Sequence, residues 1–226
     1  MPQPSTTIPR PPDAVLLDLD GTITDSAPVI LDALEVTLSE LGLPVPSRED
    51  LMAYVGPPLV DGFQANAGLT GQELARAVST YRRHYRERMC EAPLYPGVPE
   101  VLAALATAGI PVSLATSKRE VLAAQILRHW DLDPFFTVIA GADAADRHGG
   151  KAEVIGDALA RLALAGARSQ NVVHVGDRGH DVQGAREAGI LSIGVLWGSG
   201  DAEELAGATA LAASPADLAT LLGLSL

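Results

Sequence analysis

The stretch AVLLDLDGT at residues 14–22 contains two carboxylates, Asp18 and Asp20, directly after four apolar residues. An apolar run of this kind predicts a strand that is buried on both faces of a parallel sheet. Charged side chains do not continue such a strand, so we expect Asp18 and Asp20 in the loop at its carboxyl end, where ligands of open parallel sheets bind. Gly21 permits the sharp turn that follows. Taken alone, the segment is also compatible with an ordinary Asp-Gly turn.

Two carboxylates this close repel each other unless a cation or a proton neutralises one of them. A divalent cation such as Mg²⁺ suits hard oxygen ligands of this type. If the cation neutralises one carboxylate, the other stays free to move a proton. The pair therefore predicts metal-assisted chemistry at this edge of the sheet.

Helical and apolar strand patterns alternate from residue 95 onward. The strand patterns fall at Ile110–Ala115, Phe136–Ala140, Asn171–Val175 and Leu191–Leu196, and the helical patterns at Pro99–Ala108, Arg119–His129, Lys151–Leu164 and Asp181–Ala188. Together with residues 14–17 they give five strands, each joined to the next by a helix-sized connection. This pattern predicts an α/β fold with a doubly wound, Rossmann-like parallel sheet.

Residues 26–93 differ, because they contain several helical patterns and no convincing strand. Thr70 and Glu73 match a capping box, which predicts the start of a long helix running toward Met89. We predict a catalytic core formed by residues 1–22 and 95–226 and an all-helical cap domain at 23–94. Both connections to the insertion lie near the carboxyl edge of the sheet. We therefore favour a cap that closes over the site rather than a helical decoration packed elsewhere.

Composition narrows the classes of partner. The chain has 226 residues, of which 47% are hydrophobic, so it can bury a substantial core. Its formal net charge of −12 opposes binding to nucleic acid or to an anionic membrane. A single cysteine, Cys90, leaves no internal disulfide or cysteine zinc cluster to consider and is expected to be a partly buried small side chain. An anionic substrate would need local positive charge.

The first thirteen residues contain five prolines and no apolar block of signal-peptide length. They predict a frayed tail and a cytoplasmic location. Residues 101–117 carry no charge, but Gly109 and Pro111 interrupt them. This favours a helix, a turn and a strand over a membrane span.

Two further segments bring polar groups to the predicted carboxyl edge. Thr116 and Ser117 follow the strand at 110–115 and would present hydroxyl and backbone N–H groups at a helix start, as a phosphate site requires. A helix cap would explain them equally well. Lys151 follows Gly149-Gly150 and opens a helix, where the helix dipole disfavours a cation unless an anion lies nearby. A solvated lysine in a glycine-rich loop is the alternative.

The stretch GDRGHD at residues 176–181 follows the last but one predicted strand and adds two carboxylates to the same edge. We expect Asp177 to contact Mg²⁺ directly or through water. Asp181 either lies in the outer shell of the metal or caps the next helix. Arg178 and His180 are expected to be solvated loop residues, and His174 a buried core histidine.

In this order, the four segments resemble the haloacid dehalogenase (HAD) superfamily of aspartate-nucleophile phosphatases over nearly the whole chain. The helical insertion after the first motif is similar to the first cap class of that superfamily. The stretches TDS at 24–26, GPPL at 56–59 and GVLWG at 194–198 look most like the phosphoglycolate phosphatase-like branch. One departure is that Ala152-Glu153 follows Lys151 where many relatives have Pro-x-Pro, which loosens the expected geometry of that loop.

The resemblance implies a Mg²⁺-dependent phosphatase that hydrolyses a small phosphorylated metabolite through an aspartyl-phosphate. It implies that Asp18 is the nucleophile and that Asp20 is the acid and base. The expected phosphate-binding residues are Gly21, Thr116, Ser117 and Lys151, with Lys151 also catalytic, and the expected metal-binding residues are Asp18, Asp20, Asp177 and Asp181.

Several alternatives stay open, namely a nucleotidase, a sugar-phosphate phosphatase, a phosphomutase of the β-phosphoglucomutase type and a non-catalytic protein that binds a phosphorylated metabolite. Asp20 argues against a dehalogenase, which does not need a second acid. The insertion contains no lysine for a Schiff base, which argues against a phosphonate-cleaving relative. One arginine of the insertion could bind a substrate carboxylate. The candidate arginines are Arg76, Arg82, Arg83, Arg86 and Arg88. The oligomeric state is not predicted.

Overall fold

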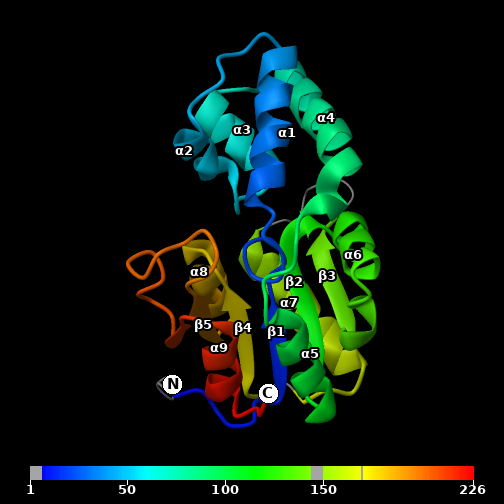
Figure 1. Ribbon diagram of the computed structural model, residues 1–226, viewed down its shortest axis with the longest axis vertical. Coiled ribbons are helices and arrows are strands. Elements are labelled where there is room, and N and C mark those ends of the chain that lie inside the picture. The colour runs from blue at the N-terminus through cyan, green and yellow to red at the C-terminus, as the bar shows by residue number, and fades with distance from the viewer. Residues whose placement is uncertain (1–6, 144–149, 169) are drawn as a thin grey trace.

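Six parallel strands form one sheet in the computed structural model, which describes residues 7–143, 150–168 and 170–226 (Figure 1). The strands are β1 (Ala14–Leu17), β2 (Val112–Arg119), β3 (Val138–Ala142), β4 (Val172–Gly176), β5 (Leu191–Val195) and β6 (Ala210–Ala212). Their order in the sheet is β3-β2-β1-β4-β5-β6. The predicted doubly wound α/β fold is confirmed. The strand order reverses between β1 and β4, so a ligand crevice is expected at the carboxyl ends of these two strands.

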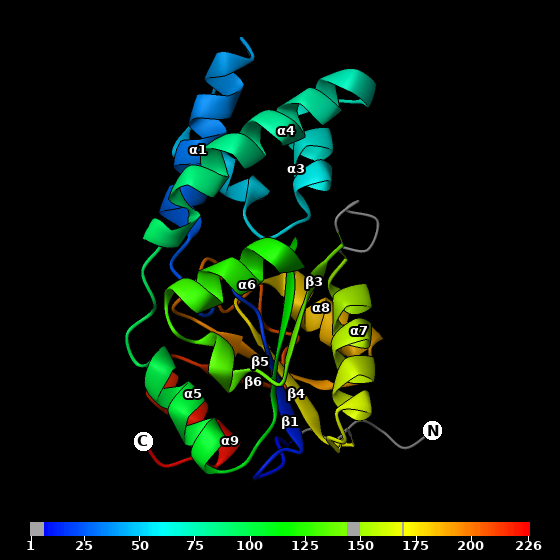
Figure 2. The ribbon, with the colours of Figure 1, turned by 90° about the vertical axis from the view of Figure 1, so that its right-hand side faces the viewer.

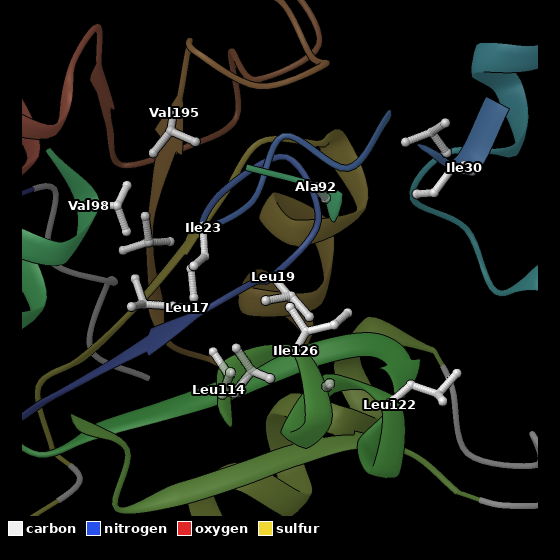
Figure 3. Packing of buried hydrophobic residues seen from close by; sticks show 14 of the residues in the cluster. Leu17, Leu19, Ile23, Ile30, Ala92, Val98, Leu114, Leu122, Ile126 and Val195 are labelled. Atoms are coloured by element: carbon white, nitrogen blue, oxygen red, sulfur yellow. The ribbon is translucent and has the colours of Figure 1, made fainter. Parts of the chain in front are cut away.

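Helices cover both faces of the sheet (Figure 2). On one face lie α7 (Lys151–Leu164) and α8 (Gly179–Glu187), and on the other α5 (Val98–Thr107), α6 (Glu120–His129) and α9 (Pro215–Leu222). Side chains alternate along β1, so Leu16 packs with the first group while Val15 and Leu17 pack with the second. Figure 3 shows Leu17 and Leu114 in the apolar cluster on the side of α5, α6 and α9. All of β1 is buried, which explains why its sequence is apolar without polar alternation.

The chain from residue 27 to residue 88 forms α1 (Ala27–Glu40), α2 (Arg48–Leu51), α3 (Leu59–Ala67) and α4 (Gly71–Arg88), which we call the cap helices. Short 3₁₀ turns lie at Met52–Tyr54 and Met89–Glu91 here, and at Asp133–Phe135 after α6. All of residues 27–93 are described, and they contain no strand. Figure 1 shows the cap helices beyond the carboxyl ends of the strands, on the side where the crevice is expected.

The cap helices have an apolar core of their own and charged outer faces. Leu34, Leu38 and Phe63 are almost fully buried. On the outside, Arg88 of α4 lies 2.7 Å from Asp32 of α1. Exposed pairs of this kind each contribute little stability, so burial of the apolar faces is what holds α1 against α4.

Three features differ from the sequence prediction. Thr70 precedes α4 as expected, but its side chain makes no capping hydrogen bond. The sequence did not predict β6 or α9. The amino-terminal tail is not frayed where it is described, because Ile8 is buried in the core and Arg10 Nε donates to the backbone oxygen of Leu221 at 3.2 Å. Residues 1–6 lie outside the described residues.

Residues 101–117 form α5 and most of β2 rather than a membrane span. Across the described part of the chain, none of the helices has the length and hydropathy needed to cross a bilayer.

Candidate active site

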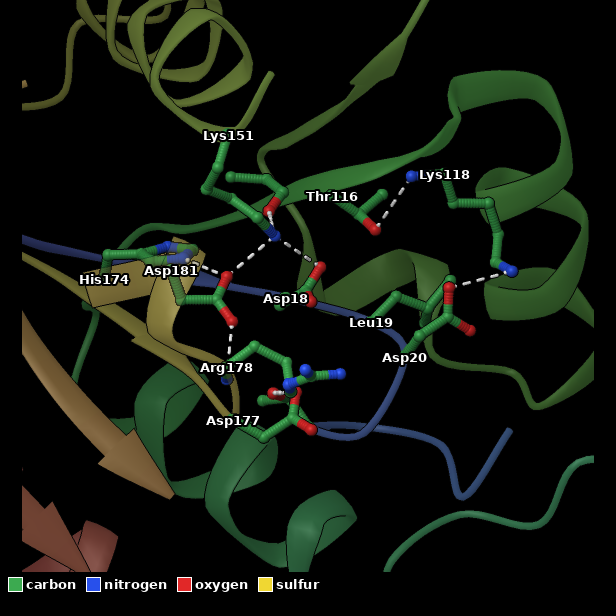
Figure 4. A network of polar contacts seen from close by, with 12 residues as sticks. Asp18, Leu19, Asp20, Thr116, Lys118, Lys151, His174, Asp177, Arg178 and Asp181 are labelled. Carbon is green, nitrogen blue, oxygen red and sulfur yellow. Dashed lines mark hydrogen bonds and ion pairs between the residues drawn. The ribbon is translucent and has the colours of Figure 1, made fainter. Parts of the chain in front are cut away.

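Asp18 lies directly after β1 at the carboxyl edge of the sheet and is 4% exposed. Its Oδ1 atom lies 2.9 Å from Nζ of Lys151, the first residue of α7 (Figure 4). The same ammonium lies 2.8 Å from Asp181 Oδ1 and donates to the backbone oxygen of Ala115 at 3.2 Å. Burial lowers the pKa of Lys151, but attraction to the two carboxylates outweighs it and raises the pKa above its usual value. Lys151 therefore carries a fixed positive charge beside Asp18.

Lys151 is thus a buried ion-pair partner and not a solvated lysine in a glycine-rich loop. Its side chain is only 2% exposed. Gly150 takes the cap position before α7, and Gly149 lies outside the described residues. The helix dipole disfavours the Lys151 ammonium at the start of α7, and the nearby carboxylates compensate for this. The sequence pattern predicted such an anion close to Lys151.

Asp181 combines two roles. Its Oδ2 accepts a hydrogen bond from the backbone N–H of Arg178 at 3.0 Å, which caps the start of α8. Its Oδ1 lies 3.0 Å from Nε2 of His174, the fully buried histidine of β4, and faces Lys151. Burial raises the pKa of Asp181, but Lys151 and His174 overcome this and lower it. Asp181 therefore fixes the position of Lys151, and its contact with a metal ion stays a prediction.

Asp177 follows β4 and is 1% exposed. Its Oδ1 accepts a hydrogen bond from Thr22 Oγ1 at 3.3 Å, and its Oδ2 accepts one from the backbone N–H of Ser199 at 2.8 Å. Gly21 has a φ of +80°, and a Cβ atom at this position would overlap Asp177 Oδ2. Gly21 therefore provides both the left-handed turn after Asp20 and the space into which Asp177 fits.

The acidic groups fit a divalent cation. Burial first, and then repulsion from Asp181 and Asp18, raises the pKa of Asp177 to about 7. Carboxylate oxygens are hard donors that Mg²⁺ binds, usually one or two of them together with water and substrate phosphate. Ligand atoms of Asp18, Asp181 and His180 all lie within 4.8 Å of one another. The carboxylate of Asp20 is instead directed to another partner, described below.

Thr116 and Ser117 lie on the last part of β2 rather than at a helix start, because β2 continues to Arg119 with a shift of register after Thr116. The cap residue of α6 is Arg119, so Thr116 and Ser117 do not cap this helix. Thr116 Oγ1 accepts a hydrogen bond from the backbone N–H of Lys118 at 3.3 Å. The buried Ser117 Oγ has no hydrogen-bond partner among the described residues. This hydroxyl is therefore available to an anion.

A cavity of about 100 Å³ lies between the sheet edge and the cap helices. Both parts of the chain contribute to its wall. From the core come Asp18, Asp20, Thr116, Ser117 and Lys118, and from the cap region Ile30, Tyr54, Gly56, Leu59, Tyr81, Arg82 and Tyr85. A larger hollow of about 680 Å³ shares Arg119, Leu122 and Ala142 with this cavity.

Two residues make polar contacts that were not predicted from the sequence. Lys118 Nζ lies 2.8 Å from Asp20 Oδ2 (Figure 4). Arg178 is not a solvated loop residue, because its guanidinium donates to the backbone oxygen of Val55 in the cap region and to Glu204 Oε1, the latter at 2.9 Å. The only available sequence signal was position, since Lys118 and Arg178 each lie beside predicted site residues.

His180 was likewise expected in solvent but is largely buried, and burial lowers its pKa. Its ring packs so closely against Gly56 of the cap region that a Cβ atom there would collide with it. Among the insertion's arginines, Arg83 pairs with Glu40 on the outer surface, whereas Arg82 lines the cavity.

The sequence model for haloacid dehalogenase-like hydrolases matches residues 15–195. This chain belongs to that family. It is 41% identical over 193 residues to the tyrosine-protein kinase PtkA of Mycobacterium tuberculosis, covering 85% of this chain and 65% of PtkA. The chain thus spans about two thirds of the length of that relative.

Two other relatives are covered more fully. The 5'-nucleotidase of Pseudomonas aeruginosa is 35% identical over 192 residues, which are 84% of this chain and 86% of the nucleotidase. A phosphoglycolate phosphatase of Neisseria meningitidis is 34% identical over 207 residues, which cover 83% of this chain and 82% of that phosphatase. A crystal structure described as a predicted phosphatase from Clostridium acetobutylicum superposes with a TM-score of 0.86 at 32% identity, covering 93% of this chain and 97% of the other. The predicted family resemblance is confirmed.

Proposed function

We propose that this protein is a Mg²⁺-dependent phosphatase that hydrolyses a small phosphomonoester through an aspartyl-phosphate on Asp18. The observation that carries the proposal is the position of Asp18, whose carboxylate lies in the cavity wall and is held by Lys151. A second acid, Asp20, lines the same cavity. The relatives named as phosphatases and as a nucleotidase support the same reaction class.

The proposed reaction has two displacements. An Asp18 carboxylate oxygen attacks phosphorus, the bond from phosphorus to the leaving oxygen breaks, and Asp20 donates a proton to that oxygen. Asp20 then removes a proton from water, which attacks phosphorus and releases inorganic phosphate and Asp18. One phosphomonoester and one water thus give an alcohol and inorganic phosphate, and the protein returns to its starting state.

Positive charge and hydrogen-bond donors offset the repulsion between Asp18 and the phosphate. Lys151 supplies a fixed charge, and the hydroxyls of Thr116 and Ser117 can donate to phosphate oxygens. Bound Mg²⁺ would supply the remaining charge neutralisation and would be held by Asp18 and Asp177, with Asp181 behind them.

The substrate we favour is a small phosphorylated acid such as 2-phosphoglycolate. A cavity of about 100 Å³ holds little more than a phosphate and a few further atoms. Arg82 extends from the proposed cap domain, residues 23–94, into the wall of this cavity, where it would bind a substrate carboxylate. Arg82→Met is expected to raise the KM for 2-phosphoglycolate about tenfold and to leave the KM for an alkyl phosphate without a carboxylate nearly unchanged.

The adjoining hollow supports a nucleotidase as the second candidate. At about 680 Å³ it is large enough for a nucleoside, and it shares Arg119, Leu122 and Ala142 with the small cavity. A larger leaving group could extend through these residues while its phosphate stays beside Asp18. The relative named as a 5'-nucleotidase is consistent with this arrangement.

The test is release of phosphate from 2-phosphoglycolate, nucleoside monophosphates, sugar phosphates and pyrophosphate, with Mg²⁺ and with EDTA. Formation of phosphotyrosine from ATP and a tyrosine peptide is measured alongside, because one relative is named a tyrosine-protein kinase. Release that requires Mg²⁺, is lost in Asp18→Asn and persists in the matched control Asp61→Asn, at an exposed carboxylate, would support the proposal. No release from any phosphomonoester, or undiminished release by freshly purified Asp18→Asn, would overturn it.

A further inference from the structure

Only two lysines occur in the whole sequence, and both contact carboxylates of the proposed active site. Lys151 faces Asp18, and Lys118 faces Asp20. Lysine is a compact point charge that fits beside a single carboxylate oxygen, whereas the planar fork of arginine needs more space. A chain that otherwise uses arginine for its permanent positive charges therefore uses lysine at these two buried contacts. Lys151 has a role in the mechanism proposed above, and Lys118 has none.

Lys118 makes three contacts that fix its side chain. Nζ lies 2.8 Å from Asp20 Oδ2 and donates a hydrogen bond to the phenol oxygen of Tyr85 at 2.6 Å. It also lies 4.3 Å from the centre of the Tyr85 ring, within the range of a cation–π interaction. The Lys118 side chain is 9% exposed, so water competes little for these contacts. Asp20 Oδ1 is buried without a hydrogen-bond partner among the described residues and is the oxygen left to carry a proton.

Tyr85 belongs to α4, one of the cap helices, and is 2% exposed. Its ring stacks on Tyr81 with 5.5 Å between centroids, and Tyr81 meets Phe63 edge to face at 6.3 Å. Burial, and then the charge of Asp20, raises the pKa of Tyr85 well above its usual value, so its phenol stays neutral and can accept from Lys118. The aromatic residues of the cap region therefore contact Lys118 through Tyr85, and Lys118 contacts Asp20.

We propose that Lys118 is a positioning residue for Asp20 and that Tyr85 makes this positioning depend on the cap lying over the site. The inference rests on the proposed function, in which Asp20 is the acid and base. A general acid works only when its proton lies within hydrogen-bond reach of the receiving atom. Lys118 holds one oxygen of Asp20 and leaves the other for proton transfer. If α4 moves away from the sheet, Lys118 loses the phenol, and Asp20 loses its fixed orientation at the moment when water can enter.

Leaving groups of different basicity distinguish positioning of Asp20 from general support of the fold. An alkyl phosphate such as 2-phosphoglycolate needs a proton on its leaving oxygen, whereas p-nitrophenyl phosphate does not. Lys118→Met should lower kcat/KM for the alkyl phosphate about 10²-fold and for p-nitrophenyl phosphate by less than about threefold. Tyr85→Phe keeps the ring and loses the phenol acceptor, so a loss of about tenfold is expected for the alkyl phosphate alone. Lys118→Arg keeps the charge and should restore part of the activity.

A double substitution shows whether Lys118 acts through Asp20. In the Asp20→Asn background, Lys118→Met should cause little further loss, because the group that Lys118 positions is already removed. Equal losses for both leaving groups, or an undiminished effect in the Asp20→Asn background, would overturn the inference and assign Lys118 to phosphate binding or folding. Turnover of p-nitrophenyl phosphate by the variants serves as the folding control. Failure of the unmodified protein to hydrolyse any phosphomonoester would overturn the proposed function, and this inference with it.

Discussion

Replacing Lys151 with methionine would remove the cation that two buried carboxylates share. Nζ lies 2.9 Å from Asp18 and 2.8 Å from Asp181, and the Lys151 side chain is 2% exposed. Methionine keeps most of the apolar stem and removes the charge, so the two carboxylates lose their common partner. Removing one member of a buried ion pair costs about 3–5 kcal/mol. For a chain of this size, that loss corresponds to a fall in Tm of roughly 10 °C.

Thermal and urea unfolding at pH 7.5 in EDTA, followed by circular dichroism, would measure this change. The pKa of Lys151 is raised in the folded protein, so its stabilising effect is complete below the usual pKa of lysine and is lost only as pH rises through the folded value. Measurement at pH 7.5 therefore captures the whole effect. Adding Mg²⁺ should recover part of the loss, because binding to the folded state again neutralises the carboxylates.

Arg168→Met is the matched control, since it also removes one positive charge, from a side chain that is 88% exposed and 3.7 Å from Asp13. A change below about 0.5 kcal/mol is expected there. If Lys151→Met lost no more stability than Arg168→Met, the buried charges of Asp18 and Asp181 would not depend on Lys151, and the electrostatic description of the site would be refuted.

Three further predictions test other parts of the structure. The pKa of Asp177 is raised to about 7, so protons compete with Mg²⁺ below that pH, and the apparent Mg²⁺ affinity should fall toward tenfold per pH unit in titration calorimetry; a flat profile from pH 5 to 8 would contradict this. Gly21→Ala should cost about 1–3 kcal/mol in urea unfolding and weaken Mg²⁺ binding, because its φ is +80° and the new Cβ displaces Asp177; unchanged binding would argue against this packing. Ser214→Ala should cost about 1 kcal/mol, since Ser214 caps α9, whereas Thr70→Ala should cost much less because Thr70 makes no capping bond; equal losses would be inconsistent with the two caps.

The sheet was predictable because each strand of four residues or more contains a short, mostly apolar run. Burial of β1 on both faces forces such a sequence, and the two carboxylates after it mark where the strand ends. The edge strand β6 has only three residues and is partly exposed, so its sequence carries no comparable signal. The helix α9 was missed although Ser214 accepts a capping hydrogen bond from Asp217, which is a recognisable pattern.

Local sequence patterns were wrong about one side-chain contact, which depends on backbone conformation, and did not predict another, which depends on how the cap helices pack. Thr70 has the sequence of a capping residue, but Gly71 takes a φ of +54°, so the chain leaves the geometry in which the threonine side chain meets the helix. The contact of Lys118 with Tyr85 joins residues 33 positions apart and depends on how α4 lies over the sheet. A sequence pattern predicts where a residue lies along a strand or helix. Which cap residue it contacts is determined by tertiary packing.

The most direct test of Asp18 as the nucleophile is to identify the phosphorylated residue. The variant Asp20→Asn, mixed with p-nitrophenyl phosphate and Mg²⁺, should form the aspartyl-phosphate without needing the acid and should then hydrolyse it slowly without the base. After acid quenching, borohydride converts an aspartyl-phosphate to homoserine, which peptide mass spectrometry can locate. We predict homoserine at position 18, and none when Asp18→Asn is added. Phosphate on another residue, or continued release of p-nitrophenolate with no phosphate bound to the protein, would contradict the proposed mechanism.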